Sequence, residues 1–572
     1  MHRAFKRLAE VDRPEVWISL RPEDDVVADA EAVDAAVAAG ARLPLAGKLL
    51  AVKDNIDVAG LPTTAGCPDY AYRPEHHAPA VERLVRAGAI VLGKTNLDQF
   101  ATGLVGVRSP YGAVRDARRP ERISGGSSAG SAVAVALGLV DLALATDTAG
   151  SGRVPAALQG IVGIKATRGL VPTVGVVPAC RSLDCVTVLA PTLATAQQAM
   201  SLITGPDPAD PTSREWPADA PLGAPPRPKV AVPGSEQLHD LDPAWLSAFE
   251  RTAARLAAAG AELVPIDIES YLSAARMMYQ SAFVAERYAA VGEFVAANPG
   301  SVDPTVRSII EAAGAIPAHQ LTTDRERLDQ LRLAATAALG DADALLLPTT
   351  THHPTIEQVQ AEPIAVNSRL GTYTNFCNLL DLGAVALPSG EFVDGDSFGV
   401  SVIVRAFADR VAGDVAALLG DPVRAGMPSD PGDVTGPTGM GLVVVGAHLS
   451  GQPLNHQLTS RGGRLIAPVR TSAEYALYAL DTSPPKPGLV RVSSGGQAIE
   501  AERWELPPAG MATFLAELPS PMALGSVRLE DGTTSTGFLV EPAAVVGAVD
   551  ITHHGGWRNY LLSTVGRPPT PP

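Results

Sequence analysis

One lysine and two serines form a pattern that could perform nucleophilic catalysis. Lys53 ends a short apolar stretch, whereas Ser127 and Ser151 each lie in a loop rich in glycine and serine. A serine hydroxyl attacks a carbonyl carbon only when a base removes its proton, and a lysine in an apolar setting can supply a neutral amine near neutral pH. These residues therefore predict acyl transfer by an activated serine, with a lysine rather than a histidine as the base.

Two simpler interpretations stay open at this point. Lys53 could form a structural ion pair with Asp54 or Asp57, and loops rich in glycine and serine also occur in flexible linkers. The loops at 124–131 and 147–153, however, flank an apolar stretch that predicts a buried helix and a buried strand. Because linkers do not flank such a unit, the two loops indicate one prepared cavity.

The elements around these loops predict an α/β domain. Helical and extended patterns alternate along the chain, which is typical of a mixed or parallel sheet flanked by helices. The predicted helices are 24–39, 78–87, 96–102 (a helix start), 132–140, 243–260, 271–298, 323–339 and 409–419. The predicted strands lie within 47–55 and at 90–92, 141–145, 230–232, 262–266, 344–348, 384–388 and 399–403.

A second, smaller domain is expected at the C-terminal end. The Pro- and Asp-rich stretch 206–228 predicts a surface excursion, and the prolines and glycines of 420–438 predict a linker. The expected organisation is a catalytic domain over 1–425, a linker over 426–439 and an α+β domain over 440–572. The strands expected in the last are 443–445, 490–493, 500–505, 526–529 and 536–540.

Composition limits the classes of function. A chain of 572 residues with 46% hydrophobic and 19% charged residues predicts a globular protein with more than one core. A net charge of −16 argues against nucleic acid as a partner, and no apolar run is long enough to cross a membrane. The four cysteines offer neither a zinc site nor a disulfide framework, and no signal peptide is apparent, so we expect a cytoplasmic protein without metal or cofactor.

Four motifs together resemble the amidase signature family of serine hydrolases. They are Gly-x-x-x-x-Val-Lys-Asp-Asn at 47–55, Gly-Gly-Ser-Ser-x-Gly-Ser at 125–131, Asp-Thr-x-Gly-Ser-x-Arg at 147–153 and Gly-Ile-Val-Gly-Ile-Lys at 160–165. The resemblance covers about residues 40 to 420. It implies the amidase signature fold, a central mixed β-sheet flanked by helices, and hydrolysis of an amide.

The resemblance also implies a role for each residue of the site. Ser151 would be the nucleophile, Ser127 a bridging serine that follows a cis peptide bond, and Lys53 the base. The oxyanion hole would use the N–H groups of Thr148, Ala149, Gly150 and Ser151. The family usually has Gly-Gly-Ser-Ile-Arg where this chain has Ala-Gly-Ser-Gly-Arg at 149–153. We expect the hole to survive this departure and the turn to be slightly looser at Gly152.

The C-terminal part resembles the second domain of the allophanate hydrolase family, which is similar to the γ-glutamyl cyclotransferase fold. The resemblance rests on the segments 446–455 and 555–560. It implies that the substrate is allophanate and that Gly126, Tyr279 and Arg287 bind it, with Arg287 holding its carboxylate. Tyr279 and Arg287 lie on one predicted helix, a little over two turns apart. A buried tyrosine and a surface arginine without function are the simpler alternative.

His448 would act in the second domain and speed the decay of the intermediate N-carboxycarbamate, although a structural histidine is an equal alternative. The resemblance further implies a homodimer and a urea carboxylase on a separate chain. The competing hypotheses are a broad-specificity amidase, one component of a tRNA-dependent amidotransferase, and an inactive protein that organises a larger assembly.

Overall fold

The chain folds into two compact units. The computed structural model describes residues 1–420 and 436–564. One unit comprises Met1–Trp216 and Arg227–Gly436, and the other comprises Pro217–Pro226 and Pro437–Pro572. Most of the predicted linker at 426–439 lies outside the described residues.

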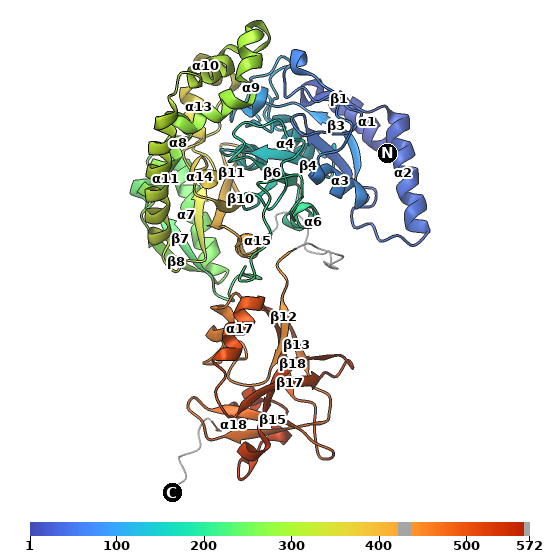
Figure 1. Cartoon of the computed structure of the whole chain (residues 1–572), viewed down its shortest axis with the longest axis vertical. Helices are drawn as coiled ribbons and strands as arrows, with labels where there is room; N and C mark the ends of the chain where they lie inside the picture. Colours follow the sequence, from blue (N-terminus) through green and yellow to red (C-terminus); the bar gives the residue numbers. More distant parts are fainter. Residues whose placement is uncertain (421–435, 565–572) are drawn as a thin grey trace. The chain divides into compact units, whose positions relative to one another are not determined.

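A mixed sheet of eleven strands, formed by described residues between 17 and 405, runs through the first unit (Figure 1). Strand β2 pairs in parallel with β3 and β4, and β7 pairs in parallel with β8 and β9, while the other pairs are antiparallel. This confirms the predicted α/β class with a central mixed sheet. The strands across the sheet are β1 (Trp17–Leu20), β3 (Ile90–Thr95), β2 (Leu49–Lys53), β4 (Leu142–Asp147), β6 (Cys185–Ala190), β5 (Val162–Lys165), β10 (Leu382–Val393), β11 (Asp396–Arg405), β9 (Ala344–Pro348), β7 (Lys229–Pro233) and β8 (Glu262–Ile266).

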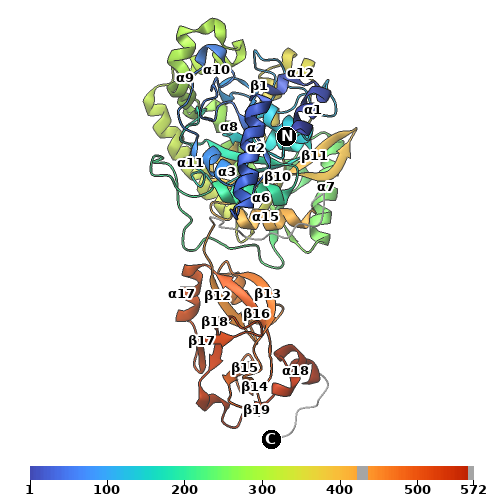
Figure 2. The same cartoon turned by 90° about the vertical axis from the view of Figure 1, so that its right-hand side faces the viewer.

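Helices surround this sheet. In Figure 1 the helices α8 to α11 gather on one side of the unit, and Figure 2 looks onto α2 on another. The helices of the unit are α1 (His2–Val11), α2 (Glu23–Ala38), α3 (Pro79–Arg86), α4 (Ala129–Ala136), α5 (Arg153–Gln159), α6 (Leu193–Ile203), α7 (Pro243–Ala258), α8 (Glu269–Gln280), α9 (Ala285–Ala297), α10 (Pro304–Ala313), α11 (Ala318–Leu339), α12 (Ile356–Ala361), α13 (Ala365–Leu370), α14 (Phe376–Leu379) and α15 (Asp409–Leu418).

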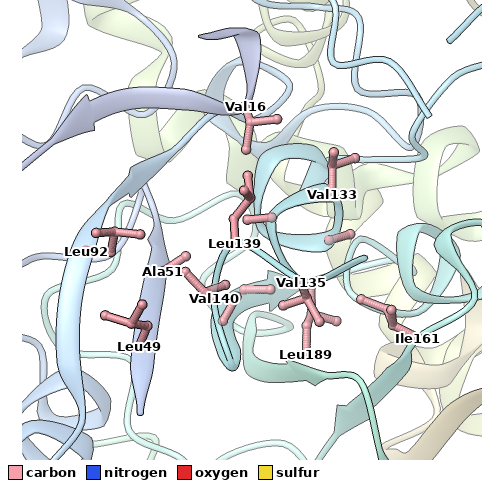
Figure 3. Close-up of a cluster of buried hydrophobic side chains, with 14 of the residues drawn as sticks. Val16, Leu49, Ala51, Leu92, Val133, Val135, Leu139, Val140, Ile161 and Leu189 are labelled. Atoms are coloured by element: carbon pink, nitrogen blue, oxygen red, sulfur yellow. The ribbon is translucent and has the colours of Figure 1, made fainter. Parts of the chain in front are cut away.

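The core places the two glycine-rich loops at the ends of buried elements. Side chains from β2, β3, α4 and β6 meet in one apolar cluster, which includes Leu49, Leu92, Val133 and Leu189 (Figure 3). Helix α4 consists of small and β-branched residues, and its first seven residues are all buried, so the helix can lie close against the strands. The Ser127 loop precedes α4 and the Ser151 loop follows β4. The packing of this αβ unit therefore fixes both serines.

The predicted helix over 271–298 is wrong, because the chain breaks at Ser281. Helix α8 ends at Gln280, a short 3₁₀ turn spans Ala282–Val284, and α9 begins at Ala285. The backbone of Ser281 is extended. Its Oγ donates a hydrogen bond to Met277 O at 2.6 Å and accepts one from the N–H of Phe283. The serine side chain thus ends one helix and caps the next turn.

The helix start predicted at 96–102 is only a 3₁₀ turn, Gln99–Ala101. Phe100 and Ala101 both have positive φ angles, 50° and 53°, which is uncommon for residues other than glycine. Asp98 just before the turn accepts the N–H groups of three later residues, so the chain curls around this carboxylate instead of continuing as a helix.

The second unit holds two small sheets and three α-helices within its described residues, as the predicted α+β class requires (Figure 2). Strands β13, β14 and β19 lie outside the strands predicted from the sequence. The first sheet orders β13 (Arg464–Arg470), β16 (Glu500–Leu506), β12 (Met440–Val444), β18 (Thr534–Val540) and β17 (Met522–Arg528). The second orders β15 (Lys486–Arg491), β14 (Tyr475–Leu480) and β19 (Val549–Asp550), and the helices are α16 (His456–Thr459), α17 (Pro508–Ala516) and α18 (Trp557–Thr564).

Part of the predicted surface excursion at 206–228 is buried in this second unit. Leu222 is only 2% exposed, and its N–H donates to Gly462 O at 2.9 Å. The N–H of Ala509 donates to Ala218 O at 3.1 Å. The stretch Pro217–Pro226 is therefore part of the fold of the second unit, although almost all of that unit comes from later in the chain.

We expect Leu222→Ala to destabilise the second unit by about 3 kcal/mol, because truncating a buried leucine removes apolar burial and leaves a cavity. Leu562→Ala is the matched control, since that leucine is 73% exposed in the same unit. Differential scanning calorimetry of the full chain, with limited proteolysis to identify the unit that unfolds, would measure the difference. Equal stability of the two variants would contradict the assignment of 217–226 to this unit.

Candidate active site

Lys53 is the last residue of β2 and is completely buried. Its Nζ lies 2.8 Å from Ser127 Oγ and 2.7 Å from Thr146 Oγ1. Within residues 1–420 and 436–564 Lys53 forms no ion pair, and Asp54 pairs instead with Lys94 at 3.1 Å. The structural ion pair considered for Lys53 is therefore not formed by any described residue, and its amine is in direct contact with Ser127.

Burial determines the charge of this lysine. Loss of solvation lowers the pKa of Lys53 to about 7, although the carboxylates of Asp98, Asp147 and Asp184 favour the charged form. Roughly half of the molecules then carry a neutral amine at pH 7. A neutral Nζ can accept the proton of Ser127, whereas an ordinary lysine could not.

The loop that carries Ser127 has little free space. The peptide bond between Gly126 and Ser127 is cis. A Cβ on Gly126 would lie 2.2 Å from Asp98 Oδ2, so only glycine fits there. The N–H of Ser128 donates to Ser151 O at 3.3 Å. The loop that carries Ser127 and the loop that carries Ser151 are thus joined directly.

Asp147 holds the loop that carries Ser151. Its carboxylate accepts the N–H of Gly150 at 2.8 Å and that of Gly152 at 3.1 Å, and it binds the Arg153 guanidinium through Nε and Nη2, both at 2.9 Å. Burial would raise the pKa of Asp147, but Arg153 outweighs it and holds that pKa below its usual value. Ser151 Oγ in turn donates to Gly103 O at 3.4 Å.

The four N–H groups predicted to form an oxyanion hole are not all free to bind a substrate. Because the Gly150 N–H is used by Asp147, it is not free to bind an oxyanion. In the part of the chain that the structure describes, the N–H groups of Thr148, Ala149 and Ser151 have no acceptor. These three are the remaining candidate donors.

Gly152 does not loosen the turn as expected. Its backbone is helical, with φ of −97°, and a Cβ there would lie 2.5 Å from Thr187 Cγ2. The buried Thr187 side chain fills the space beside the turn, so glycine at 152 permits close packing.

Arg287 and Tyr279 meet although they lie on different helices. The Arg287 Nη2 is 3.5 Å from Tyr279 Oη, and its guanidinium lies 5.4 Å from the centre of the tyrosine ring. Arg287 Nη1 donates to Thr102 Oγ1 at 2.8 Å. The predicted pair is therefore brought together by the break at Ser281, and Thr102 is a partner that the sequence did not indicate.

Arg287 is a buried cation that no described residue pairs with an anion. It is 2% exposed, its Nε has no hydrogen-bond acceptor, and no ion pair to it is found among the described residues. A buried charge is costly unless it is paired. A cavity of about 440 Å³ also lies against Tyr279, lined by apolar side chains such as Ile309 and Ile316 and by polar ones such as Arg108, but not by Arg287 itself. The unpaired guanidinium, rather than this cavity, makes this corner of the first unit suited to a small carboxylate.

His448 lines a separate cavity of about 180 Å³ in the second unit. Its Nε2 is 2.9 Å from Gln457 Oε1, and its ring stacks on Phe538 with centroids 4.9 Å apart. Burial lowers the pKa of His448 to about 4, so the imidazole is neutral at pH 7. Since Gln457 Oε1 can only accept a hydrogen bond, Nε2 carries the hydrogen of the neutral ring and Nδ1 is the lone-pair acceptor. Lys486 lines the same cavity.

The two C-terminal motifs meet in one half-buried network. Arg558 donates to Ser450 O at 2.8 Å and to Glu502 Oε1 at 2.7 Å, while the N–H of Ser450 donates to Glu502 Oε2. Arg558 therefore ties α18 to the segment that follows His448. Its contacts give it a structural role.

Metal-binding and membrane features were searched over the same described ranges. No group of three or more histidine, cysteine or acidic side chains there could hold a metal ion, and no helix there is long and apolar enough to cross a membrane. All four cysteines are buried and free: Cys67, Cys180, Cys185 and Cys377.

Comparison with known proteins assigns the family. The Amidase family model matches residues 2–411, and the model of the allophanate hydrolase C-terminal domain matches residues 440–562. The chain belongs to the amidase family. The same two matches confirm both resemblances predicted from the sequence motifs.

Individual relatives agree with this assignment. The solved allophanate hydrolase of Kluyveromyces lactis is 39% identical, with a TM-score of 0.86 over 98% of this chain and 97% of that one. The urea amidolyase of Saccharomyces cerevisiae is 41% identical over 546 residues, 91% of this chain but only 30% of that protein. A glutamyl-tRNA(Gln) amidotransferase component of Haloarcula marismortui is 34% identical over 397 residues, 64% of this chain and 93% of that component.

Proposed function

We propose that this chain is an allophanate hydrolase that uses Ser151, Ser127 and Lys53 as its catalytic triad. The observation that carries the proposal is the buried guanidinium of Arg287, which has no carboxylate partner among the described residues and lies against Tyr279. Allophanate is a small amide that carries one carboxylate, which would pair with this cation. The match to the Kluyveromyces lactis allophanate hydrolase over nearly the whole chain supports the same substrate.

The catalytic steps follow from the contacts of the triad. Ser151 Oγ attacks the terminal amide carbonyl of allophanate, and its proton passes through Ser127 Oγ to the neutral Nζ of Lys53. The N–H groups of Thr148, Ala149 and Ser151 bind the oxyanion. The proton returns to the leaving nitrogen, which departs as ammonia, and water then hydrolyses the acyl-enzyme. The product is N-carboxycarbamate.

The second unit acts on that product. N-carboxycarbamate loses carbon dioxide and then ammonia, and the His448 cavity would speed this decay. The neutral ring of His448 presents Nδ1 as a hydrogen-bond acceptor, with the Lys486 side chain in the same cavity. Allophanate would leave the chain as two molecules of carbon dioxide and two of ammonia.

The proposal is tested by ammonia release from the purified full chain. We expect turnover of allophanate and slower turnover of malonamate, which keeps the carboxylate and one amide, with almost none of a bulky aryl amide. Preference for the aryl amide would contradict the proposal and favour a broad-specificity amidase. Glutaminase activity that depends on added tRNA would favour the amidotransferase alternative, whose relative from Haloarcula marismortui matches 64% of this chain.

We expect kcat/KM for allophanate to rise with pH through a midpoint near 7. Below the Lys53 pKa of about 7 the amine is protonated and cannot accept a proton, and above it the neutral base is fully present. Initial rates of ammonia release between about pH 5.5 and 9 would define this rise of kcat/KM with pH. A flat profile across this range would contradict Lys53 as the base.

We expect His448→Asn to slow the second reaction only. The first ammonia should appear at the wild-type rate, while N-carboxycarbamate accumulates and is seen by ¹³C NMR of labelled allophanate. His456→Asn is the matched control, an exposed histidine in the same unit. Accumulation in both variants or in neither would assign His448 a structural role.

A homodimer, a separate urea carboxylase and a cytoplasmic location stay predictions. The chain spans about 30% of the length of the urea amidolyases of Saccharomyces cerevisiae and Lachancea kluyveri. Light scattering of the purified protein would give its oligomeric state. Co-purification from the native cell would identify a carboxylase partner.

A further inference from the structure

Asp98 is a completely buried carboxylate whose partners are backbone groups. It accepts the N–H of Val105 at 3.1 Å, of Gly106 at 3.0 Å and of Arg108 at 3.0 Å. In the described parts of the chain no lysine, arginine or histidine forms an ion pair with it. Three N–H groups aimed at one carboxylate fix the path of the loop from 103 to 108.

This loop and the turn before it contact both the Ser151 hydroxyl and the Arg287 guanidinium. Gly103 O is the acceptor of the Ser151 hydroxyl at 3.4 Å, and Thr102 Oγ1 accepts a hydrogen bond from Arg287. A Cβ on Gly103 would lie 2.5 Å from Asp98 Oδ2, so the loop approaches the carboxylate as closely as a glycine allows. A shift of Asp98 would therefore move the acceptor of the nucleophile and the partner of the carboxylate clamp together.

Asp98 also contacts the bridging serine from the other side. Its own N–H donates to Ser127 O at 3.2 Å, and its Oδ2 fills the space where a Cβ on Gly126 would be. Gly126 and Ser127 share the cis peptide bond. One residue thus holds the Ser127 peptide through its backbone and the Gly103 loop through its side chain.

We propose that Asp98 is a positioning residue for the hydrolytic reaction, which sets the relative places of Ser127, Ser151 and Lys53. The inference rests on the proposed triad but not on the identity of the amide. Asp98 acts through Ser127, Ser151 and Lys53 and not by contact with the substrate. Without the Asp98 carboxylate, the loop that contacts Ser151 and the loop that carries Ser127 would no longer be held by the same residue.

The charge of Asp98 gives the proposal a specific signature. Three carboxylates act on the Lys53 amine, those of Asp98, Asp147 and Asp184, and Asp98 opposes the effect of burial most strongly. Asp147 is neutralised by Arg153, and Asp184 is bound by Thr148 and two N–H groups. Removing the negative charge at position 98 would therefore lower the pKa of Lys53 further.

The test compares Asp98→Asn and Asp98→Glu with the wild type in the full chain. We expect Asp98→Asn to lower kcat/KM by about 10- to 100-fold, because its NH₂ group would face the loop N–H donors and displace Ser151 and Ser127 from their working geometry. The midpoint of its pH profile should also move to lower pH. Asp98→Glu should lose activity with the midpoint near that of the wild type, because its negative charge is kept.

Asp116→Asn is the matched control. Asp116 is equally buried and accepts two loop N–H groups, from Arg118 and Arg119, but it has no contact with the triad. A loss in Asp98→Asn no larger than in Asp116→Asn, or an unmoved midpoint, would overturn the proposal. If the wild type hydrolyses malonamate but not allophanate, the substrate assignment fails, and the same comparison on malonamate still decides the role of Asp98.

Discussion

Ser151→Ala is expected to lower kcat for allophanate by about 10⁴- to 10⁶-fold, the range in which removing the nucleophile of a serine hydrolase falls. The Ser151 hydroxyl is the proposed nucleophile. The Ser127 hydroxyl does not replace it, because it is bound to the base at 2.8 Å from Lys53 Nζ. Ser128→Ala is the matched control, since its hydroxyl donates to Thr146 O and has no role in the proton path. We expect that variant to lose less than about tenfold.

The triad also predicts a non-additive result. Lys53→Met should lose nearly as much activity as Ser151→Ala, and the double variant should be no worse than the single ones, because the residues act as a unit. Single-turnover ammonia release measures all three on one scale. Independent, multiplying losses would mean that Lys53 does not act through Ser151. A wild type no faster than Ser151→Ala would identify an inactive, organising protein.

The order of the main elements could be predicted from the sequence, because their periodicity is local. Helix 24–39 and strand 344–348 agree with α2 and β9 within one residue. The two glycine-rich loops could also be located from the sequence, since positions where other groups come close to the backbone accept few residues other than glycine. The roles assigned to Lys53, Ser127 and Ser151 came from family motifs and stay predictions, although the Lys53 contact now supports them.

The parts that could not be predicted depend on contacts between distant residues. The break at Ser281 arises when its hydroxyl binds Met277 O, which competes with a strong helical pattern on both sides. The burial of Leu222 depends on a unit that lies more than two hundred residues later in the sequence. Thr102 and Asp98 had no role in the sequence motifs. Only the fold shows that Thr102 contacts Arg287 and that Asp98 contacts the Ser127 loop.

Arg287→Gln is expected to lower kcat/KM for allophanate by about 10²- to 10³-fold, because it removes the only partner proposed for the substrate carboxylate and leaves that charge buried and unpaired. Arg287→Lys should recover part of the loss, since an ammonium keeps the charge but not the planar fork of donors. Arg327→Gln, an exposed arginine on α11, is the matched control. Thermal melts of each variant would exclude a folding defect.

Biuret makes this prediction specific to the carboxylate. It has the shape of allophanate but carries an amide in place of the anion, so the wild type should prefer allophanate by about the same 10²- to 10³-fold. In Arg287→Gln that preference should vanish, because neither substrate finds a cationic partner beside Tyr279. Parallel measurement of kcat/KM for both substrates in both proteins gives a thermodynamic cycle. An unchanged preference in the variant would show that the carboxylate binds elsewhere, and the unpaired charge of Arg287 would then serve the fold.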